Sequence, residues 1–211
     1  MARLRLGVLV SGEGTNLQAI LDAIAKGSLD AEVGVVLSNR PGVRALQRAE
    51  QAGVASECIP HGQFPSREDF DRRLVERLQA ARAEWIVLAG FMRLLTPVFL
   101  EAFPSRILNI HPSLLPVFPG TKPIRDALDY GVKVTGCTVH LVDEGTDSGP
   151  IVGQQAVEVR EGDDEVSLAA RIHEAEHRLY VDTLIAISRG GLVLEHTAGG
   201  RYRASLRLSA S

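Results

Sequence analysis

Apolar runs that alternate with helical patterns limit the folds open to this 211-residue chain more than any other feature of its sequence. Five segments are short and almost continuously apolar, which is typical of parallel strands buried on both faces. These segments are residues 6–10, 33–37, 54–59, 85–89 and 106–110. Between them, residues 17–25, 43–51 and 66–82 repeat apolar side chains at helical spacing. We therefore predict an α/β fold: a Rossmann-like, mostly parallel sheet with helices on both faces.

The pattern changes in the C-terminal part of the chain. Residues 134–142 and 151–159 are long strand-like runs around a glycine-rich turn, and they predict an antiparallel extension of the sheet. Residues 164–189 are expected to form one long helix, and residues 192–196 and 202–208 a terminal hairpin. We find no repeat, low-complexity tract or linker, so residues 1–211 are expected to form a single domain.

Composition narrows the classes of function. With 45% apolar residues, 23% charged residues and a net charge of −3, the chain is typical of a globular protein that binds neither nucleic acid nor membrane. No segment approaches the ~20 apolar residues of a membrane helix, and no signal peptide is visible. Cys58 and Cys137 are expected to be buried thiols. We expect a cytoplasmic protein.

Two polar side chains end the apolar strand 106–110. Residues two apart on a strand point to the same side, so Asn109 and His111 should face one spot. Pro112 keeps His111 extended, and four prolines in the loop that follows should make that loop stiff. An amide that stabilises an oxyanion and an imidazole that moves a proton suit reactions of a carbonyl group. Capping of the strand end by Asn109, with His111 bonded to a backbone carbonyl, is an equally good explanation.

The segment 11–17 is rich in small residues and joins the first strand to the first helix. Such a turn can bring backbone N–H groups close to a phosphate. It matches neither the dinucleotide fingerprint, because Leu17 replaces the third glycine, nor a P-loop. A tight turn with Thr15 or Asn16 as the helix N-cap explains the segment equally well.

An acidic loop, residues 143–150, joins the two predicted C-terminal strands 134–142 and 151–159. A solvated turn is its commoner explanation, and Gly145 is wrongly placed for a calcium loop. The functional interpretation is that Asp147 approaches His111, orients the imidazole and favours its protonated form.

The helical sequence HEAEH at residues 173–177 matches two zinc-protease motifs. His173 and His177 could bind zinc with a glutamate as general base, but no clear third ligand follows. A polar face formed by His173, Glu176 and His177, beside a ligand or in solvent, is the alternative.

Taken together, these segments resemble the phosphoribosylglycinamide formyltransferases, folate-dependent enzymes of purine synthesis in the formyltransferase superfamily. The resemblance runs from the first strand to about His177. It is carried by SGEGTNLQ at 11–18, LAGFMR at 88–93, NIHPSLLP at 109–116, GCTVH at 136–140 and DSGP at 147–150. The chain departs from the pattern at His173, where some members have Gln, and at 122–124, where some relatives are richer in His.

The resemblance implies three groups of site residues. The catalytic set would be Asn109, His111 and Asp147. The residues for glycinamide ribonucleotide would be Gly14, Thr15, Asn16 and Glu176. Those for 10-formyltetrahydrofolate would be Arg67, Met92, Arg93, Leu94, Leu95 and Asn109. It also implies a phosphate-binding half at about 1–105 and a folate-binding, catalytic half at about 106–211.

The implied reaction transfers the formyl group of the co-substrate 10-formyltetrahydrofolate to the amine of glycinamide ribonucleotide, without a metal. The products would be the N-formyl ribonucleotide and tetrahydrofolate, within the synthesis of IMP. The alternatives are a formyltetrahydrofolate hydrolase, a zinc hydrolase built on the HEAEH helix, and a binding protein without chemistry. The resemblance allows a monomer or a homodimer, since family members include both.

Overall fold

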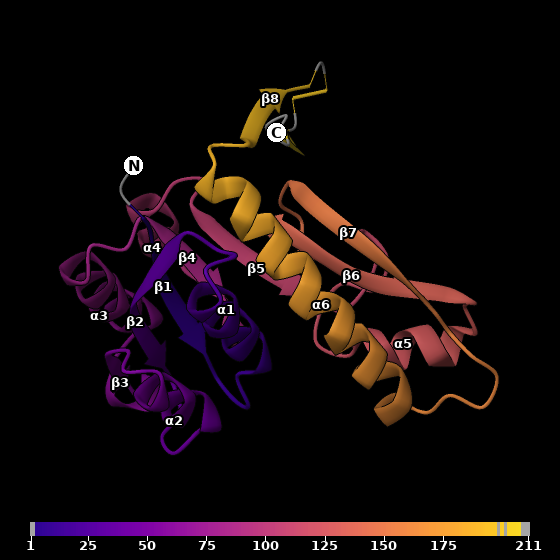
Figure 1. Ribbon diagram of the computed structural model, residues 1–211, viewed down its shortest axis with the longest axis horizontal. Helices are drawn as coiled ribbons and strands as arrows, with labels where there is room; N and C mark the ends of the chain where they lie inside the picture. The colour runs from indigo at the N-terminus through magenta and orange to yellow at the C-terminus, as the bar shows by residue number, and fades with distance from the viewer. Residues whose placement is uncertain (1–2, 198, 201, 208–211) are drawn as a thin grey trace. The chain divides into compact units, whose positions relative to one another are not determined.

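The computed structural model describes residues 3–197, 199–200 and 202–207. The chain forms two compact units, Met1–Asn109 and Ile110–Ser211 (Figure 1). Strands β1 to β7 follow the order β3-β2-β1-β4-β5-β6-β7 in one sheet, and β8 and β9 form a second, two-stranded sheet. The predicted α/β class, with its antiparallel C-terminal extension, is confirmed.

The first unit contains the parallel part of the sheet. Its strands are β1 (Leu4–Val10), β2 (Ala31–Ser38), β3 (Ser56–Cys58), β4 (Trp85–Leu88) and all of β5 (Ile107–His111) except the last two residues. Its helices are α1 (Thr15–Ala25), α2 (Arg44–Gln51), the 3₁₀ turn η1 (His61–Gln63), α3 (Arg67–Ala80) and α4 (Pro97–Ala102). Leu6, Val8, Leu9 and Val10 of β1 are fully buried, as a central strand covered on both faces requires.

The direction of winding reverses beside β1. The chain moves from β1 to β2 and β3 on one side, and then crosses to β4 and β5 on the other. Because crossovers between parallel strands are right-handed, the helices before and after the reversal cover opposite faces. Accordingly α1 packs against α2, and α3 packs against α4 (Figure 1). Ligands of such sheets bind beyond the carboxyl ends of the strands at this reversal, which here means the ends of β1 and β4.

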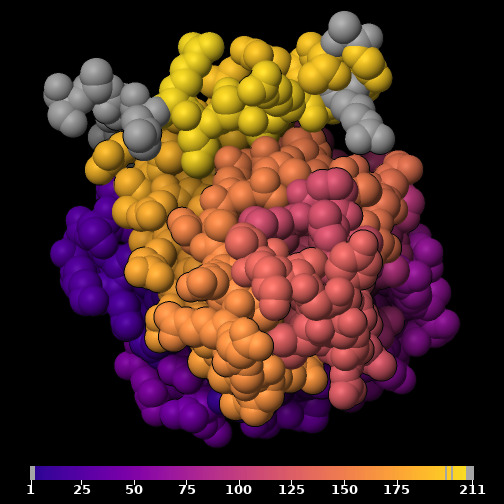
Figure 2. Space-filling view, turned by 90° about the vertical axis from the view of Figure 1, so that its right-hand side faces the viewer, coloured from indigo at the N-terminus to yellow at the C-terminus, as the bar shows by residue number. Residues whose placement is uncertain are grey.

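The second unit contains α5 (Pro123–Tyr130), β6 (Val134–Leu141), β7 (Ile151–Glu158), α6 (Glu165–Ser188), β8 (Leu192–His196) and β9 (Tyr202–Leu206). Strands β6 and β7 pair antiparallel, and α6 packs on both. Leu168, Ile172 and Ala175 of α6 form a buried cluster with Cys137 of β6. The described residues of the terminal hairpin, yellow in Figure 2, contact β7 and α6 through β9.

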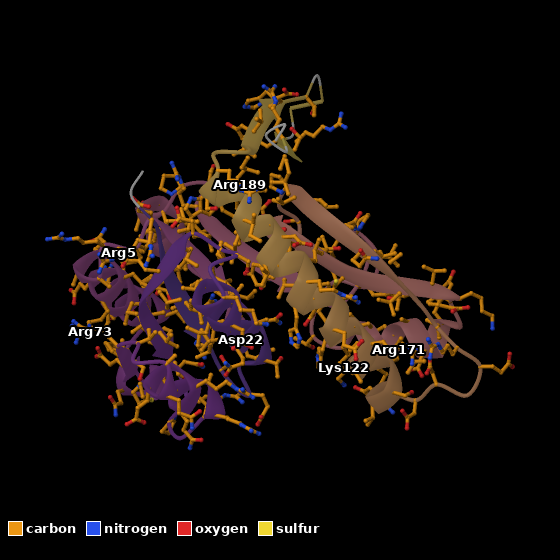
Figure 3. All side chains as sticks on the ribbon, viewed as in Figure 1. Arg5, Asp22, Arg73, Lys122, Arg171 and Arg189 are labelled. Carbon is orange, nitrogen blue, oxygen red and sulfur yellow. The ribbon has the colours of Figure 1, made fainter. Side chains whose placement is uncertain are left out.

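A reciprocal cap begins α6. The side chain of Asp164 accepts a hydrogen bond from the Ser167 N–H, and Ser167 Oγ accepts one from the Asp164 N–H. These bonds satisfy two amides that the first turn of a helix leaves without intrahelical partners. Arg171, labelled in Figure 3, lies one turn further along and pairs with Asp163 just before the cap.

The structure corrects the sequence analysis at several points. Helices α4 and α5 and the turn η1 were not predicted, and α5 begins at Pro123 within the segment expected to be only a stiff loop. Proline suits the first turn of a helix because the N–H that it lacks would have no intrahelical partner there. Cys58 is partly exposed rather than buried, although both cysteines are free thiols. Residue 208 of the predicted hairpin lies outside the described residues. Within the described residues, no helix combines the length and the apolarity needed to cross a membrane.

Candidate active site

Asn109 and His111 lie on the last three residues of β5, as the sequence predicted. Their spacing of two places both side chains on one face of the strand. His111 is 4% exposed, and Asn109 is partly buried. An imidazole buried this deeply must satisfy its nitrogens with protein groups or a ligand, because an unpaired buried polar atom is costly.

Both ring nitrogens of His111 face acceptors. Its Nε2 atom lies 2.8 Å from the carbonyl oxygen of Phe118. Its Nδ1 atom lies 3.4 Å from Oδ2 of Asp147, so the predicted approach of Asp147 to His111 is confirmed as geometry. A carbonyl can only accept, so Nε2 must donate to Phe118. The contact between Nδ1 and the carboxylate is attractive when that nitrogen also carries a proton. The ring is therefore held between a carbonyl and a carboxylate.

A second histidine, which the sequence analysis did not single out, contacts the same carboxylate. His140 is 2% exposed, and its Nε2 lies 3.7 Å from Oδ1 of Asp147. Its Nδ1 lies 2.9 Å from the carbonyl oxygen of Leu141, which can only accept. The Asp147 carboxylate thus lies between two imidazoles. The sequence offered one signal for His140, its position at the end of the GCTVH motif. Spacing along the chain cannot show that His111, His140 and Asp147, which lie in three separate segments, come together.

Asp147 is held in an unusual conformation. Its φ of 53° lies in the left-handed region, which non-glycine residues seldom adopt and which often marks functional sites. Its Oδ2 accepts a hydrogen bond from the Gly120 N–H at 2.9 Å. Burial raises the pKa of Asp147, but hydrogen bonds from His140 and Gly120 and the positive charge of both histidines outweigh it and lower the pKa overall. Asp147 therefore remains an anion beside His111.

The loop after β5 is fixed to the antiparallel strands by one hydroxyl. Thr138 Oγ1 donates to the Ser113 carbonyl at 2.7 Å, and it accepts from the Leu115 N–H at 3.1 Å and from Gln154 Nε2 at 3.0 Å. Gln154 Nε2 also lies 2.9 Å from the Leu115 carbonyl. These buried bonds support the predicted stiffness of this loop. The sequence did not predict that Thr138 and Gln154 bind the loop after β5, because these contacts depend on which strands lie beside that loop.

Gly14 shapes the small-residue loop in the first unit. Its φ is 71°, and a Cβ added there would lie 2.6 Å from the Cβ of Ala45, so no other residue fits without strain. Gly14 is also the N-cap of α1; the proposed N-cap role of Thr15 or Asn16 is therefore wrong. Glycine has no side chain with which to cap the start of α1. The N-terminus of a helix can accept a phosphate through its free backbone N–H groups.

The loops that follow β1 and β4 are joined by a hydroxyl group. Ser11 is buried, and its Oγ accepts a hydrogen bond from the Met92 N–H at 2.9 Å and donates to Asn39 Oδ1 at 2.6 Å. This links the segment that includes Gly14 with the segment that includes Met92, at the reversal of the sheet. Beyond it, Arg67 Nη2 donates to the Leu94 carbonyl at 2.8 Å. Arg93 and Leu95 are partly buried.

The polar side chains of the HEAEH sequence differ in burial. Glu176 is 4% exposed, whereas His173 is exposed and His177 is intermediate. Burial and, secondly, the charge of Glu176 raise the pKa of the Cys137 thiol to about 12, as expected for an inert buried cysteine. Among the described residues, no three His, Cys, Asp or Glu side chains are grouped so that they could hold a metal ion. The zinc-hydrolase alternative thus lacks a third ligand there.

The predicted site residues belong to both units. Gly14, Thr15, Asn16, Arg67, Met92, Arg93, Leu94, Leu95 and Asn109 lie in Met1–Asn109, whereas His111, Asp147 and Glu176 lie in Ile110–Ser211. Within the second unit, the structure brings His111 and Asp147 into contact. Within the first, it joins the loops of Gly14 and Met92 through Ser11.

Comparison with known proteins gives matches along most of the chain. Residues 4–184 match the family described as formyl transferase. The chain is 47% identical over 190 residues to a phosphoribosylglycinamide formyltransferase of Mycobacterium tuberculosis, a match that covers 90% of this chain and 87% of the relative. It is 48% identical over 192 residues to a trifunctional purine biosynthetic protein of Drosophila pseudoobscura pseudoobscura, with 90% of this chain but only 14% of that protein covered.

A solved structure is similar over almost the entire length of the chain. The glycinamide ribonucleotide transformylase 1 of Symbiobacterium toebii is 50% identical, with a TM-score of 0.92. The match covers 96% of this chain and 94% of that structure. The family match at residues 4–184 includes β5 and the 143–150 loop.

Proposed function

As this chain belongs to the formyl transferase family, we propose that it transfers the formyl group of 10-formyltetrahydrofolate to the amine of glycinamide ribonucleotide. The products are the N-formyl ribonucleotide and tetrahydrofolate, in the synthesis of purines. The observation that carries the proposal is the buried contact between His111 and Asp147, with Asn109 on the same strand as His111. Relatives named for this activity support it.

The reaction begins when the amine nitrogen attacks the formyl carbon. Negative charge then builds on the formyl oxygen, where the Asn109 amide and protonated His111 stabilise it. One such donor contributes about 3 kcal/mol to the transition state. Asp147 keeps its charge because its pKa is lowered, so it favours the imidazolium form of His111. The tetrahedral intermediate collapses when the bond from the formyl carbon to the folate nitrogen breaks.

Proton transfer completes the step. The attacking amine loses a proton, and the departing folate nitrogen gains one. His111, with an ordered water, relays this proton between the two nitrogens. The relay uses no metal ion, so a chelator leaves the rate unchanged.

The Phe118 carbonyl indicates how the formyl group reaches the imidazole. His111 has two nitrogens, and both face acceptors, Asp147 and Phe118. A bond to a charged carboxylate is stronger than one to a neutral carbonyl, so the formyl oxygen displaces Phe118 rather than Asp147. The formyl oxygen would then take the place of the Phe118 oxygen beside Nε2 of His111.

The two substrates are held by distinct groups. The loop of Gly14, Thr15 and Asn16 binds the phosphate of the ribonucleotide through backbone N–H groups, and Glu176 contacts the same substrate. Arg67, Met92, Arg93, Leu94, Leu95 and Asn109 bind the folate. Residues 1–105 thus supply the phosphate-binding loop and five of the six folate residues, and residues 106–211 supply His111, Asp147, Glu176 and the sixth folate residue, Asn109.

A formyl-transfer assay tests the proposal. Purified protein is mixed with 10-formyltetrahydrofolate, with and without glycinamide ribonucleotide, and each reaction is repeated with a chelator. Chelator-insensitive deformylation that requires the ribonucleotide is expected. Deformylation without the ribonucleotide would favour the hydrolase, and loss of activity with chelator would favour metal-dependent chemistry. Fractionation and sedimentation test the remaining proposals, a cytoplasmic location and a homodimer.

A further inference from the structure

One face of α3 holds the segment that follows β4. Arg67 and Asp71 are four positions apart on α3, and Phe70 is three positions after Arg67, so the three side chains share a face. Arg67 donates to the Leu94 carbonyl at 2.8 Å, and the Arg93 guanidinium lies 5.7 Å from the centre of the Phe70 ring. The face therefore contacts two successive residues of the segment.

Asp71 anchors the end of the same segment. Asp71 is buried, with 2% of its surface exposed. Its Oδ2 accepts hydrogen bonds from the Thr96 N–H at 2.6 Å and the Thr96 hydroxyl at 2.7 Å. Thr96 is 3% exposed and is the N-cap of α4, and its carbonyl accepts from the amides of Phe99 and Leu100. One carboxylate oxygen thus fixes the point where the segment ends and α4 begins.

The cost of burying this carboxylate suggests that its charge has a use. An ionised group away from water is costly unless opposite charge and hydrogen bonds compensate. Burial raises the pKa of Asp71, while the two Thr96 bonds and the positive charges of Arg67 and Arg93 lower it in part. A buried apolar residue would stabilise the fold at lower cost, but it could neither accept the two Thr96 hydrogen bonds nor attract the guanidinium groups of Arg67 and Arg93.

The segment between the anchors exposes apolar side chains. Met92 is 65% exposed and Leu94 is 60% exposed, so two large apolar side chains two positions apart are open to solvent. The Met92 N–H is fixed by Ser11, and the Leu94 carbonyl by Arg67. These apolar side chains are therefore displayed by a backbone that is held on both sides. Such a display suits a flat, largely apolar ligand group whose binding would cover them.

We propose that Asp71 is a positioning residue for the formyl donor: its carboxylate, through the two Thr96 hydrogen bonds and its attraction for Arg67 and Arg93, holds residues 92–95 in the conformation that receives the folate. This inference rests on the proposed function, in which these residues bind 10-formyltetrahydrofolate. Asp71 itself is buried and contacts no substrate. Its effect should appear in the affinity for the folate and not in the chemical step.

The test compares Asp71→Asn with Glu76→Gln, an exposed acid on the same helix that pairs with Arg73. Loss of the charge at Asp71 should raise KM for 10-formyltetrahydrofolate about tenfold, as expected for weakened hydrogen bonds to a charged group. The KM for glycinamide ribonucleotide and kcat at saturation should stay within about twofold of the parent values. Glu76→Gln should change none of them.

A second pair of variants separates positioning from folding. Thr96→Val removes the hydroxyl that contacts Asp71 and leaves the size of the side chain unchanged, so it should raise the same KM by a smaller factor. Thr96→Ser retains the hydroxyl and should restore the parent KM. The affinity for tetrahydrofolate, measured by calorimetric titration, should fall in each variant in which KM for the folate rises. This series reports on the contact even when Asp71→Asn folds poorly.

The outcomes separate this inference from the proposed function. Formyl transfer by the parent chain, with KM for the folate unchanged in Asp71→Asn and Thr96→Val, would overturn this inference alone. So would an equal rise in KM for both substrates. A parent chain that binds tetrahydrofolate through an Asp71-dependent site but transfers no formyl group would overturn the proposed function alone. A parent chain that binds no folate would overturn both.

Discussion

The Nδ1 atom of His111, at the end of a buried strand, lies 3.4 Å from Oδ2 of Asp147, which comes from a loop between two other strands. The backbone of Asp147 is left-handed, and its carboxylate also accepts from Gly120. An uncommon backbone conformation that aims an anion at a buried imidazole supports the catalytic role that we propose for this pair. The first predictions test this pair.

Replacing His111 with Asn should lower kcat at least about 100-fold, because it removes the proton-transferring group of the reaction. The assay is deformylation of 10-formyltetrahydrofolate in the presence of glycinamide ribonucleotide. His196→Asn, in the terminal hairpin, is the matched control and should retain full activity. Turnover near the parent value in folded His111→Asn protein would remove His111 from the mechanism.

Replacing Asp147 with Asn should lower the rate at neutral pH. The pKa of Asp147 is lowered, so the parent carboxylate is ionised throughout the neutral range and can attract a positive charge that develops on His111. Asparagine carries no charge, so kcat at pH 7 should fall about 100-fold. Because protonation of Asp147 would remove the same charge from the parent, the ratio of the two rates should shrink as the pH falls below 3.8. A ratio that stays constant into that range would contradict the electrostatic role.

Replacing Asn109 with Ala should lower kcat by about 10²–10³, as removal of one oxyanion donor does. The KM for each substrate should change much less, because the amide acts mainly on the charge that develops in the transition state. Steady-state kinetics with each substrate varied in turn provides the measurement. A large rise in KM for the folate with unchanged kcat would limit the role of Asn109 to folate binding.

Gly14→Ala should strain the first loop, whereas Gly12→Ala should not. A Cβ on Gly14 would lie 2.6 Å from Ala45 in a backbone with φ of 71°, but one on Gly12 meets nothing within 4 Å. Urea unfolding should show a loss of about 1–3 kcal/mol for the Gly14 variant. Its KM for glycinamide ribonucleotide should also rise, while that for the folate stays near the parent value. Equal effects of the two substitutions would argue against this geometry.

Asp163 should contribute to stability only above acidic pH. Hydrogen bonds from Arg171, labelled in Figure 3, and from the Arg160 N–H lower the pKa of Asp163 from 3.8 to about 2. A depressed carboxyl pKa gives stability that is present above the unfolded value and lost as the pH falls through the folded value. Asp163→Asn should therefore melt earlier than the parent at pH 7, with a difference that shrinks below about pH 4.

The control for that series is Glu161→Gln, which changes an exposed acid in the same turn. Melting temperatures of the three proteins from pH 7 to pH 2 provide the comparison. A constant difference between Asp163→Asn and the parent over this range would exclude ionisation of Asp163 as its cause.

Much of the architecture follows from the sequence because it depends on local patterns. Continuous apolar runs predicted the buried strands, and period-3.6 patterns predicted α1, α2, α3 and α6. The short helices α4 and α5 were missed because each begins at a proline, which also reads as a loop, and has too few turns for a clear period. The predicted N-cap of α1 was wrong because glycine is needed at position 14, where Ala45 approaches the backbone closely.

The sequence by itself determined that Asn109 and His111 share a face, because two positions on a strand always do. Only the tertiary structure decided that Asp147 contacts His111 and that His140 contacts the same carboxylate. It also decided that Asp71 accepts a hydrogen bond from Thr96. Each of these contacts joins residues from different elements, and their distances depend on how strands and loops pack. Periodicity reports on one element at a time, so it cannot contain such distances.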